Sequence, residues 1–187
     1  MKKLRQPTSL NCFACGKNNP FGLHLEWFND DAKQQVETTF TLGDNYCSYP
    51  GTVHGGIIAT ILDETSGRAV LLNNNFNNLM VTLKMEVTYK KNTPTNTPLR
   101  AVGRLIKGGT SRAQVEGEII LPDGSVSAKC TSILFKIPQA VQDKWGPEAD
   151  EWARTTPTAQ EIADATAADG CACGCSCAGA EKTDDQK

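Results

Sequence analysis

The stretch His54-Gly55-Gly56-Ile57-Ile58-Ala59-Thr60-Ile61-Leu62-Asp63 opens a helix that we predict from near His54 to about Leu72. Along it, residues that can be buried recur at intervals of three and four positions: Ile57, Ile58, Ile61, Leu62, Thr65 and Ala69. This spacing puts them on one face of a helix, where they can pack on a sheet. A second stripe consists of small residues, and Asp63 lies within it.

The segments on both sides of this helix show the alternation that is typical of strands. Before it, residues 23–29 and 36–42 alternate between apolar and polar side chains, and the turn formers Asn29-Asp30-Asp31 separate them. After it, four more strands are predicted, at 81–89, 99–107, 112–121 and 126–137. In the first of these four, the alternation puts Thr82 on the polar face.

The order of two strands, one long helix and four strands predicts an α+β domain in which an antiparallel sheet wraps around the helix. Such a sheet has an exposed edge strand, and one helix covers only part of its faces. Pairing edge to edge with a second copy would protect that edge. We therefore expect the domain to dimerise through its sheet, as a homodimer or a homotetramer.

Composition divides the chain into an irregular N-terminal segment (1–22), the α+β domain (23–138) and a C-terminal tail (139–187). Residues 1–138 contain 15 Lys and Arg against 11 Asp and Glu, whereas the tail contains 4 against 10, so a body of charge +4 precedes a tail of charge −6. A body this diffusely basic suits a small anionic ligand rather than nucleic acid. The polar tail is expected to be partly disordered, with a short helix at 158–168 as an alternative.

The N-terminus is basic but leads into no apolar stretch of the kind that a secretory signal needs. No segment approaches the roughly 18 apolar residues of a membrane span. We therefore expect a cytoplasmic protein with no membrane partner. In that compartment the eight cysteines are expected to be reduced thiols or metal ligands rather than disulfides.

His54-Gly55-Gly56 lies where the long helix is predicted to start. Free backbone N–H groups there carry the positive end of the helix dipole, so they can bind an oxygen on which negative charge develops. Glycines let a substrate carbonyl approach this backbone closely. The same residues are also compatible with a simple tight turn, and His54 is compatible with helix capping alone.

Asp63 strengthens the case for chemistry, because an acidic side chain on a largely buried helix is costly unless it is paired or used. Its neighbour Glu64 is placed for an ion pair with Arg68 on the solvent side of the helix. No such local cation is available to Asp63, although backbone N–H groups could satisfy it. At about 1.5 Å per residue, Asp63 is roughly 13 Å from His54, so one carbonyl can meet both only if two antiparallel helices meet at a two-fold axis.

The residues from His54 to Asp63, together with Val81-Thr82-Leu83-Lys84-Met85-Glu86-Val87-Thr88-Tyr89-Lys90, resemble the phenylacetate-type (PaaI-like) branch of hotdog thioesterases, which includes the thioesterase-superfamily-member enzymes of animals. The opening Cys12-Phe-Ala-Cys15-Gly with Asn19-Pro20-Phe21-Gly22 is similar to an N-terminal signature of these proteins. The resemblance covers residues 12–138. It implies a hotdog fold, active sites at a dimer interface and hydrolysis of acyl-CoA without metal or cofactor.

The resemblance also implies roles for single residues. The acid at Asp63 is the general base or nucleophile, and Thr82 helps to position the lytic water, although a surface threonine would also fit its position. A backbone N–H of Gly55 or Gly56 polarises the thioester carbonyl, and His54 holds that loop. Some relatives have Asn or Gln six residues before the histidine, where this chain has Ser48.

Because coenzyme A is highly anionic, basic side chains are expected along its path, with Lys90 and Arg112 as candidates beside Lys91 and Lys107. The cysteines suggest a separate function. Cys12 and Cys15 have half of a zinc-site spacing, and Cys171, Cys173, Cys175 and Cys177 could bind a soft metal such as zinc or copper(I). A redox-sensitive tail is the alternative.

Two other functions remain open. A hotdog hydratase or dehydratase would need a histidine paired with an acid, and His24 and His54 are the two histidines of the sequence. A non-catalytic dimer could instead bind acyl-CoA as a sensor. Loss of acyl-CoA hydrolysis in Asp63→Ala distinguishes the thioesterase from both.

Overall fold

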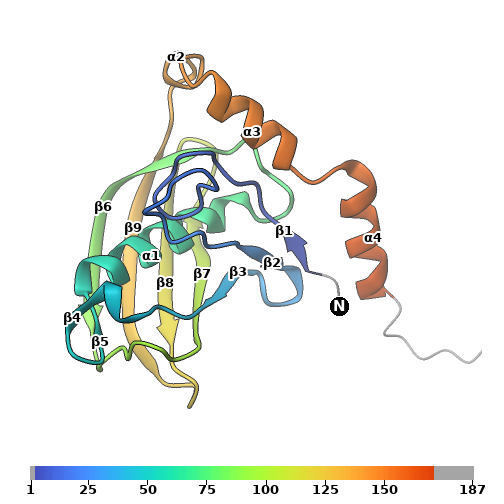
Figure 1. Ribbon diagram of the computed structural model, residues 1–187. Helices are drawn as coiled ribbons and strands as arrows, with labels where there is room; N and C mark the ends of the chain where they lie inside the picture. The colour runs from blue at the N-terminus through green and yellow to red at the C-terminus, as the bar shows by residue number, and fades with distance from the viewer. Residues whose placement is uncertain (1–2, 171–187) are drawn as a thin grey trace, which may run out of the picture.

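The computed structural model describes residues 3–170 of the chain, as a curved antiparallel sheet that holds one long helix in its concave face (Figure 1). The sheet has seven strands, which lie side by side in the following order: β1 (Leu4–Arg5), β2 (Phe28–Asp30), β3 (Gln35–Phe40), β7 (Leu99–Gly108), β8 (Arg112–Ile120), β9 (Val126–Lys136) and β6 (Met80–Tyr89). A separate pair, β4 (Cys47–Tyr49) and β5 (Thr52–Val53), precedes the helix. The predicted α+β architecture is confirmed.

The helix α1 spans Gly55–Gly67 and continues as a 3-10 turn over Arg68–Leu71, close to the predicted range. Its buried face holds Ile58, Ile61 and Leu62, as the spacing predicts. The helix backbone comes close to the sheet at Gly103, where an added Cβ would lie 2.2 Å from the carbonyl oxygen of Thr65. Glycine on β7 is therefore what allows α1 to lie this deep in the sheet.

The predicted opening hairpin is present, but its first strand is shorter than expected. A short 3-10 helix, Asp31–Lys33, connects β2 to β3, and residues 23–27 are not part of any strand. Their side chains alternate as predicted, with Leu25 and Trp27 buried. The backbone instead bonds to the N-terminal segment, and His24 has a left-handed φ of 51° that interrupts an extended chain. The alternation therefore predicted correctly which side chains are buried, but these residues do not pair with a neighbouring strand.

A β-bulge at Leu83 shifts the predicted alternation of the first part of β6 by one residue, whereas Met85 and Val87 still pack against the core. Thr82 pairs with Leu134 of β9, whereas Lys84 pairs with Ile133, so Leu83 is an extra residue on β6. Because Leu134 is buried against the helix, its partner Thr82 faces the helix too. The prediction that Thr82 lies on the polar face was wrong, because a bulge shifts a strand's alternation by one residue.

Three helices follow the sheet: α2 (Gln139–Gln142), α3 (Pro147–Thr155) and α4 (Ala159–Gly170). In Figure 1, α3 lies beside the N-terminal segment. Glu148 accepts hydrogen bonds from the backbone N–H groups of Leu10 and Asn11, and Trp152 Nε1 donates to the carbonyl of Phe76 at 3.1 Å. The start of the predicted tail therefore contacts the domain. Along residues 3–170, no helix is both long and apolar enough to span a membrane.

Candidate active site

His54 caps the start of α1 with its own side chain. The residue is the N-cap, and its Nδ1 accepts a hydrogen bond from the backbone N–H of Gly56 at 2.9 Å. Because Nδ1 accepts, the proton of a neutral ring lies on Nε2. Of the two glycines that the sequence offered, Gly56 therefore has its N–H engaged. Within the described chain, the N–H of Gly55 has no hydrogen-bond acceptor.

Tyr89, at the end of β6, fixes the backbone on which this free N–H lies. Its hydroxyl donates to the carbonyl oxygen of Gly55 at 2.8 Å, across 34 residues of sequence. Tyr89 was not predicted as a site residue, because the alternation places it only at an apolar position of a strand. No pattern in the sequence brings its hydroxyl to the start of α1, since the two are 34 residues apart.

Asp63 and Thr82, which were both predicted as site residues from the sequence, are in direct contact. Thr82 Oγ1 donates to Asp63 Oδ1 at 2.7 Å. The bulge described above brings the threonine to the helix side of β6. Both residues line a cavity of about 350 Å³, which is also bounded by Leu79, Met80 and Val81. A carboxylate held by a hydroxyl at the wall of a cavity can activate a water or attack an electrophile.

The three predicted substrate-binding residues are spread over the surface. Ser48 is exposed on β4, and within the described residues its side chain has no hydrogen bond. Lys90 is exposed directly after Tyr89, at the same end of β6 as the start of α1. Arg112 lies over the ring of Phe135 at 5.6 Å, on the opposite face of the sheet from α1. A single chain therefore does not bring Arg112 to Asp63.

The sequence predicted that Arg68 lies on the solvent side of α1, but the structure buries it. Its predicted ion pair with Glu64 is present, with Nε 2.8 Å from Oε1, but the Arg68 side chain is only 4% exposed. The guanidinium lies between the rings of Trp27 and Trp152, at 4.5 and 5.8 Å from their centroids. It also donates to the carbonyl of Pro7 at 2.9 Å. Two aromatic faces and several acceptors together compensate for burying the charge.

Cys12 and Cys15 face this same end of the helix, beside Glu64. The pKa of the Cys15 thiol is lowered to about 6, first by a hydrogen bond from the Cys12 side chain and also by the charge of Arg68. The pKa of Cys12 is raised by the same hydrogen bond and by burial. The tail residues Cys171, Cys173, Cys175 and Cys177 lie outside the described residues.

Residues 50–128, which include α1, β6, β7 and β8, match the family model of the thioesterase superfamily. A crystal structure of a thioesterase superfamily protein superposes with a TM-score of 0.60 at 27% identity, covering 68% of this chain and 60% of that one. Over this segment the chain is similar to the thioesterase superfamily, and the sheet wrapped around α1 is a hotdog fold. The predicted hotdog fold and the resemblance to thioesterases are thereby confirmed.

Proteins similar to this chain include a named thioesterase and a protein solved with a coenzyme A ester. The acyl-coenzyme A thioesterase THEM4 of Mus musculus is 29% identical over 93 residues, which is 50% of this chain and 39% of the mouse protein. The chain thus matches well under half the length of this curated relative. A Streptococcus mutans protein whose structure was solved with acetyl-CoA has 27% identity and a TM-score of 0.50, covering 56% of this chain and 82% of that protein.

Within the hotdog domain, the candidate groups form two sets at opposite ends of α1. Gly55, His54 and Tyr89 make up the first set, with one free N–H donor. Asp63 and Thr82 make up the second, with one carboxylate. Eight residues of helix separate Gly55 from Asp63, or about 12 Å. An N–H donor for an oxyanion and a carboxylate base for a nucleophile are therefore both present. Within one chain they are too far apart to act on the same carbonyl.

Proposed function

We propose that this chain hydrolyses acyl-CoA thioesters to the free acid and coenzyme A. The hydrogen bond between Thr82 and Asp63 is the observation that carries the proposal, because it holds a carboxylate in place at a cavity wall. The mouse relative, an acyl-coenzyme A thioesterase, and the acetyl-CoA bound to the Streptococcus mutans relative support the same substrate class.

Asp63 acts as the general base in the simplest mechanism. It takes a proton from a water molecule that Thr82 helps to position, and the water oxygen attacks the thioester carbonyl. The Gly55 N–H stabilises the negative charge on the carbonyl oxygen, and the dipole of α1 adds to it. When the intermediate collapses, the C–S bond breaks, coenzyme A leaves as a thiolate, and the proton that Asp63 took from the water converts it to the thiol. In the alternative route, Asp63 attacks the carbonyl directly and expels the thiolate, which gives an anhydride that water then hydrolyses.

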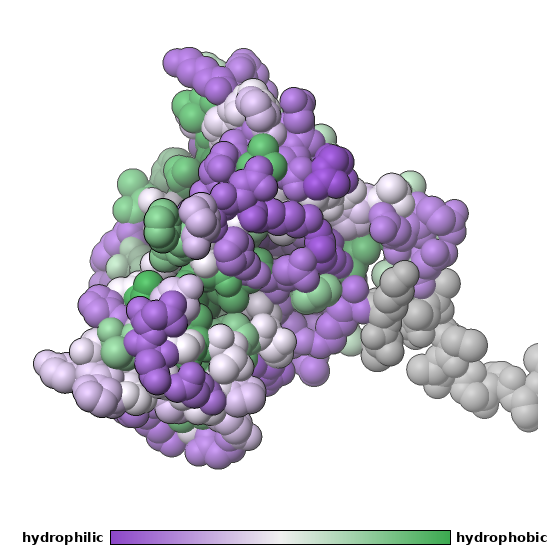
Figure 2. Space-filling model, viewed as in Figure 1, coloured by the Kyte–Doolittle hydropathy of each residue, from purple (hydrophilic) through white to green (hydrophobic). Residues whose placement is uncertain are grey.

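A two-fold dimer completes each site in this proposal. Strand β6 is bonded to β9 on one side and is the last strand of the described sheet. Its side chains Val81 and Leu83 are 52% and 66% exposed, and Figure 2 shows hydrophobic surface along that side of the molecule. Pairing two such edges antiparallel would cover these side chains and oppose the two α1 helices. Gly55 of one copy would then face Asp63 of the other.

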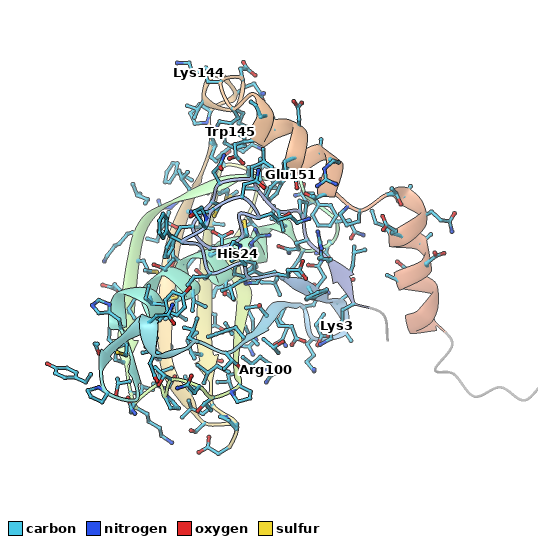
Figure 3. All side chains as sticks on the ribbon, in the orientation of Figure 1. Lys3, His24, Arg100, Lys144, Trp145 and Glu151 are labelled. Carbon is cyan, nitrogen blue, oxygen red and sulfur yellow. The ribbon has the colours of Figure 1, made fainter. Side chains whose placement is uncertain are left out.

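The geometry gives less support to a hydratase. His24 is exposed on the N-terminal segment (Figure 3), and His54 uses Nδ1 to accept from Gly56. Neither histidine is paired with an acid among the described residues.

Thiol release from a panel of acyl-CoA esters of increasing chain length tests the proposal. Wild type should hydrolyse at least one ester, and Asp63→Asn should lower kcat by about 10²- to 10⁴-fold, the range that a general base contributes. Glu86→Gln is the matched control, because this carboxylate lies on the outer face of β6, where it pairs with Lys84. Tight acyl-CoA binding without turnover in wild type would favour a sensor instead.

A further inference from the structure

Cys12, Cys15 and Glu64 form a cluster that the proposed thioesterase chemistry does not use. One ligand atom from each residue, two sulfurs and a carboxylate oxygen, lies within 4.8 Å of the other two. The cysteines come from the N-terminal segment and Glu64 from α1, so the cluster joins two parts of the chain. Figure 1 shows that segment lying over the helix.

The N-terminal segment is built to hold the two sulfurs in this position. The N–H of Gly16 donates to the carbonyl of Cys12 at 2.8 Å, and a Cβ at Gly16 would lie 2.5 Å from that oxygen. Only glycine therefore fits this turn. Hydrogen bonds from Leu23 N–H to Phe13 O, at 2.8 Å, and from Leu25 N–H to Ala14 O, at 2.9 Å, hold the segment between the two cysteines.

A neighbouring side chain also holds the carboxylate of the cluster. Arg68 Nε donates to Glu64 Oε1 at 2.8 Å and so orients this group. Outer partners of this kind hold metal ligands in place.

We propose that Cys12, Cys15 and Glu64 bind a zinc ion, with a fourth position open to the cavity that Asp63 and Thr82 line. Cys12 and Glu64 belong to the wall of that cavity, as does Asp63. Two thiolates and one carboxylate are a donor set that zinc accepts, whereas copper(I) prefers sulfur alone and magnesium or calcium prefers oxygen. The ion would link the N-terminal segment to α1, one residue beyond Asp63.

Zinc titration of the full chain against a chromophoric chelator tests the site without reference to turnover. Cys171, Cys173, Cys175 and Cys177 are first replaced with serine, so that the thiols of the tail cannot bind the metal. This background should bind one equivalent of zinc. Adding Cys12→Ser or Cys15→Ser should weaken binding by more than the roughly 10- to 100-fold that loss of an outer partner costs, and Glu64→Gln should weaken it clearly as well. Cys47→Ser is the matched control, because this cysteine is free and exposed.

A second measurement needs no variant of the cluster. Zinc should slow alkylation of Cys12 and Cys15 by iodoacetamide, read peptide by peptide in the mass spectrometer, while Cys47 stays reactive. Unchanged alkylation of Cys15 in the presence of zinc would overturn the proposal. So would complete loss of zinc binding on replacing the tail cysteines, full affinity in Glu64→Gln, or a Cys12–Cys15 disulfide that forms in air at the same rate with zinc present.

Discussion

The hydroxyl of Thr82 donates to Oδ1 of Asp63 at 2.7 Å, from a strand to a helix 19 residues away. The contact exists because the bulge at Leu83 turns Thr82 toward α1. The hydroxyl donates and the carboxylate oxygen accepts, so this bond fixes the orientation of the Asp63 side chain. Within the described residues, Oδ2 has no partner, so one oxygen is held and the other is available for chemistry.

Thr82→Ala should therefore lower kcat for acyl-CoA hydrolysis while leaving the fold intact. A hydrogen bond to a charged group contributes about 1.5–3 kcal/mol, which corresponds to roughly a 10- to 100-fold loss. Thr82→Ser keeps the donor and should retain most of the activity. Equal rates in the alanine and serine variants, measured by thiol release, would show that the hydroxyl has no catalytic part.

Gly56→Ala should destabilise the domain, although alanine is the better helix former. An added Cβ would lie 3.0 Å from Nδ1 of His54, so the capping side chain must move. Loss of a helix cap costs about 0.5–2 kcal/mol. Urea unfolding should therefore show a lower midpoint for this variant.

Gly67→Ala is the control at the other end of α1, where a Cβ would have no neighbour within 4 Å and the backbone is helical, with a φ of −58°. There the substitution should raise stability by about 0.4–1 kcal/mol. A Gly56→Ala variant as stable as wild type would mean that His54 does not hold the start of the helix.

Arg68→Met should destabilise the protein far more than the same change at Arg112. Removing Arg68 leaves Glu64, whose side chain is 28% exposed, without its cation and opens the space between two tryptophans. We expect a loss of about 2–3 kcal/mol, below the 3–5 kcal/mol of a fully buried pair. Arg112→Met removes a cation from one ring on an open face, for less than about 1 kcal/mol. Thermal unfolding compares the two variants, and similarly small losses in both would show that Arg68 behaves as a surface residue.

Local pattern was enough to predict α1, because its apolar residues repeat at helical spacing and therefore share the face that is buried against the sheet. It also identified Asp63, because this acid lies in the helix's second stripe, of small residues, and has no local cation. The strands after the helix followed from alternation for the same reason.

Long-range contacts were not predictable in this way. The bulge at Leu83 depends on the pairing of β6 with β9, so alternation placed Thr82 on the wrong face. The burial of Arg68 depends on Trp27 and Trp152, which are far from it in sequence. For the same reason, the spacing of Cys12 and Cys15 could not identify Glu64 as their neighbour.

Whether each site is shared between two copies can be decided by mixing two inactive variants. Asp63→Asn removes the base. Gly55→Pro removes the N–H, and proline is well tolerated at the first helical position. His54, with a ψ of 132°, already has the conformation that a residue before proline prefers, and a Cβ at Gly55 would lie at an ordinary contact distance of 3.6 Å from the Tyr89 ring. Each variant alone should be inactive and should unfold at a midpoint close to that of wild type.

In a mixed dimer with shared sites, one site carries both defects and the other carries neither. Random assembly of equal amounts makes about half of the dimers mixed, so activity should return to about a quarter of the wild-type value. If each chain instead held a complete site, every site in the mixture would carry one defect and no activity would return. Co-expression with two affinity tags isolates the mixed dimer, in which about half of the wild-type rate per dimer is expected because one of its two sites is intact.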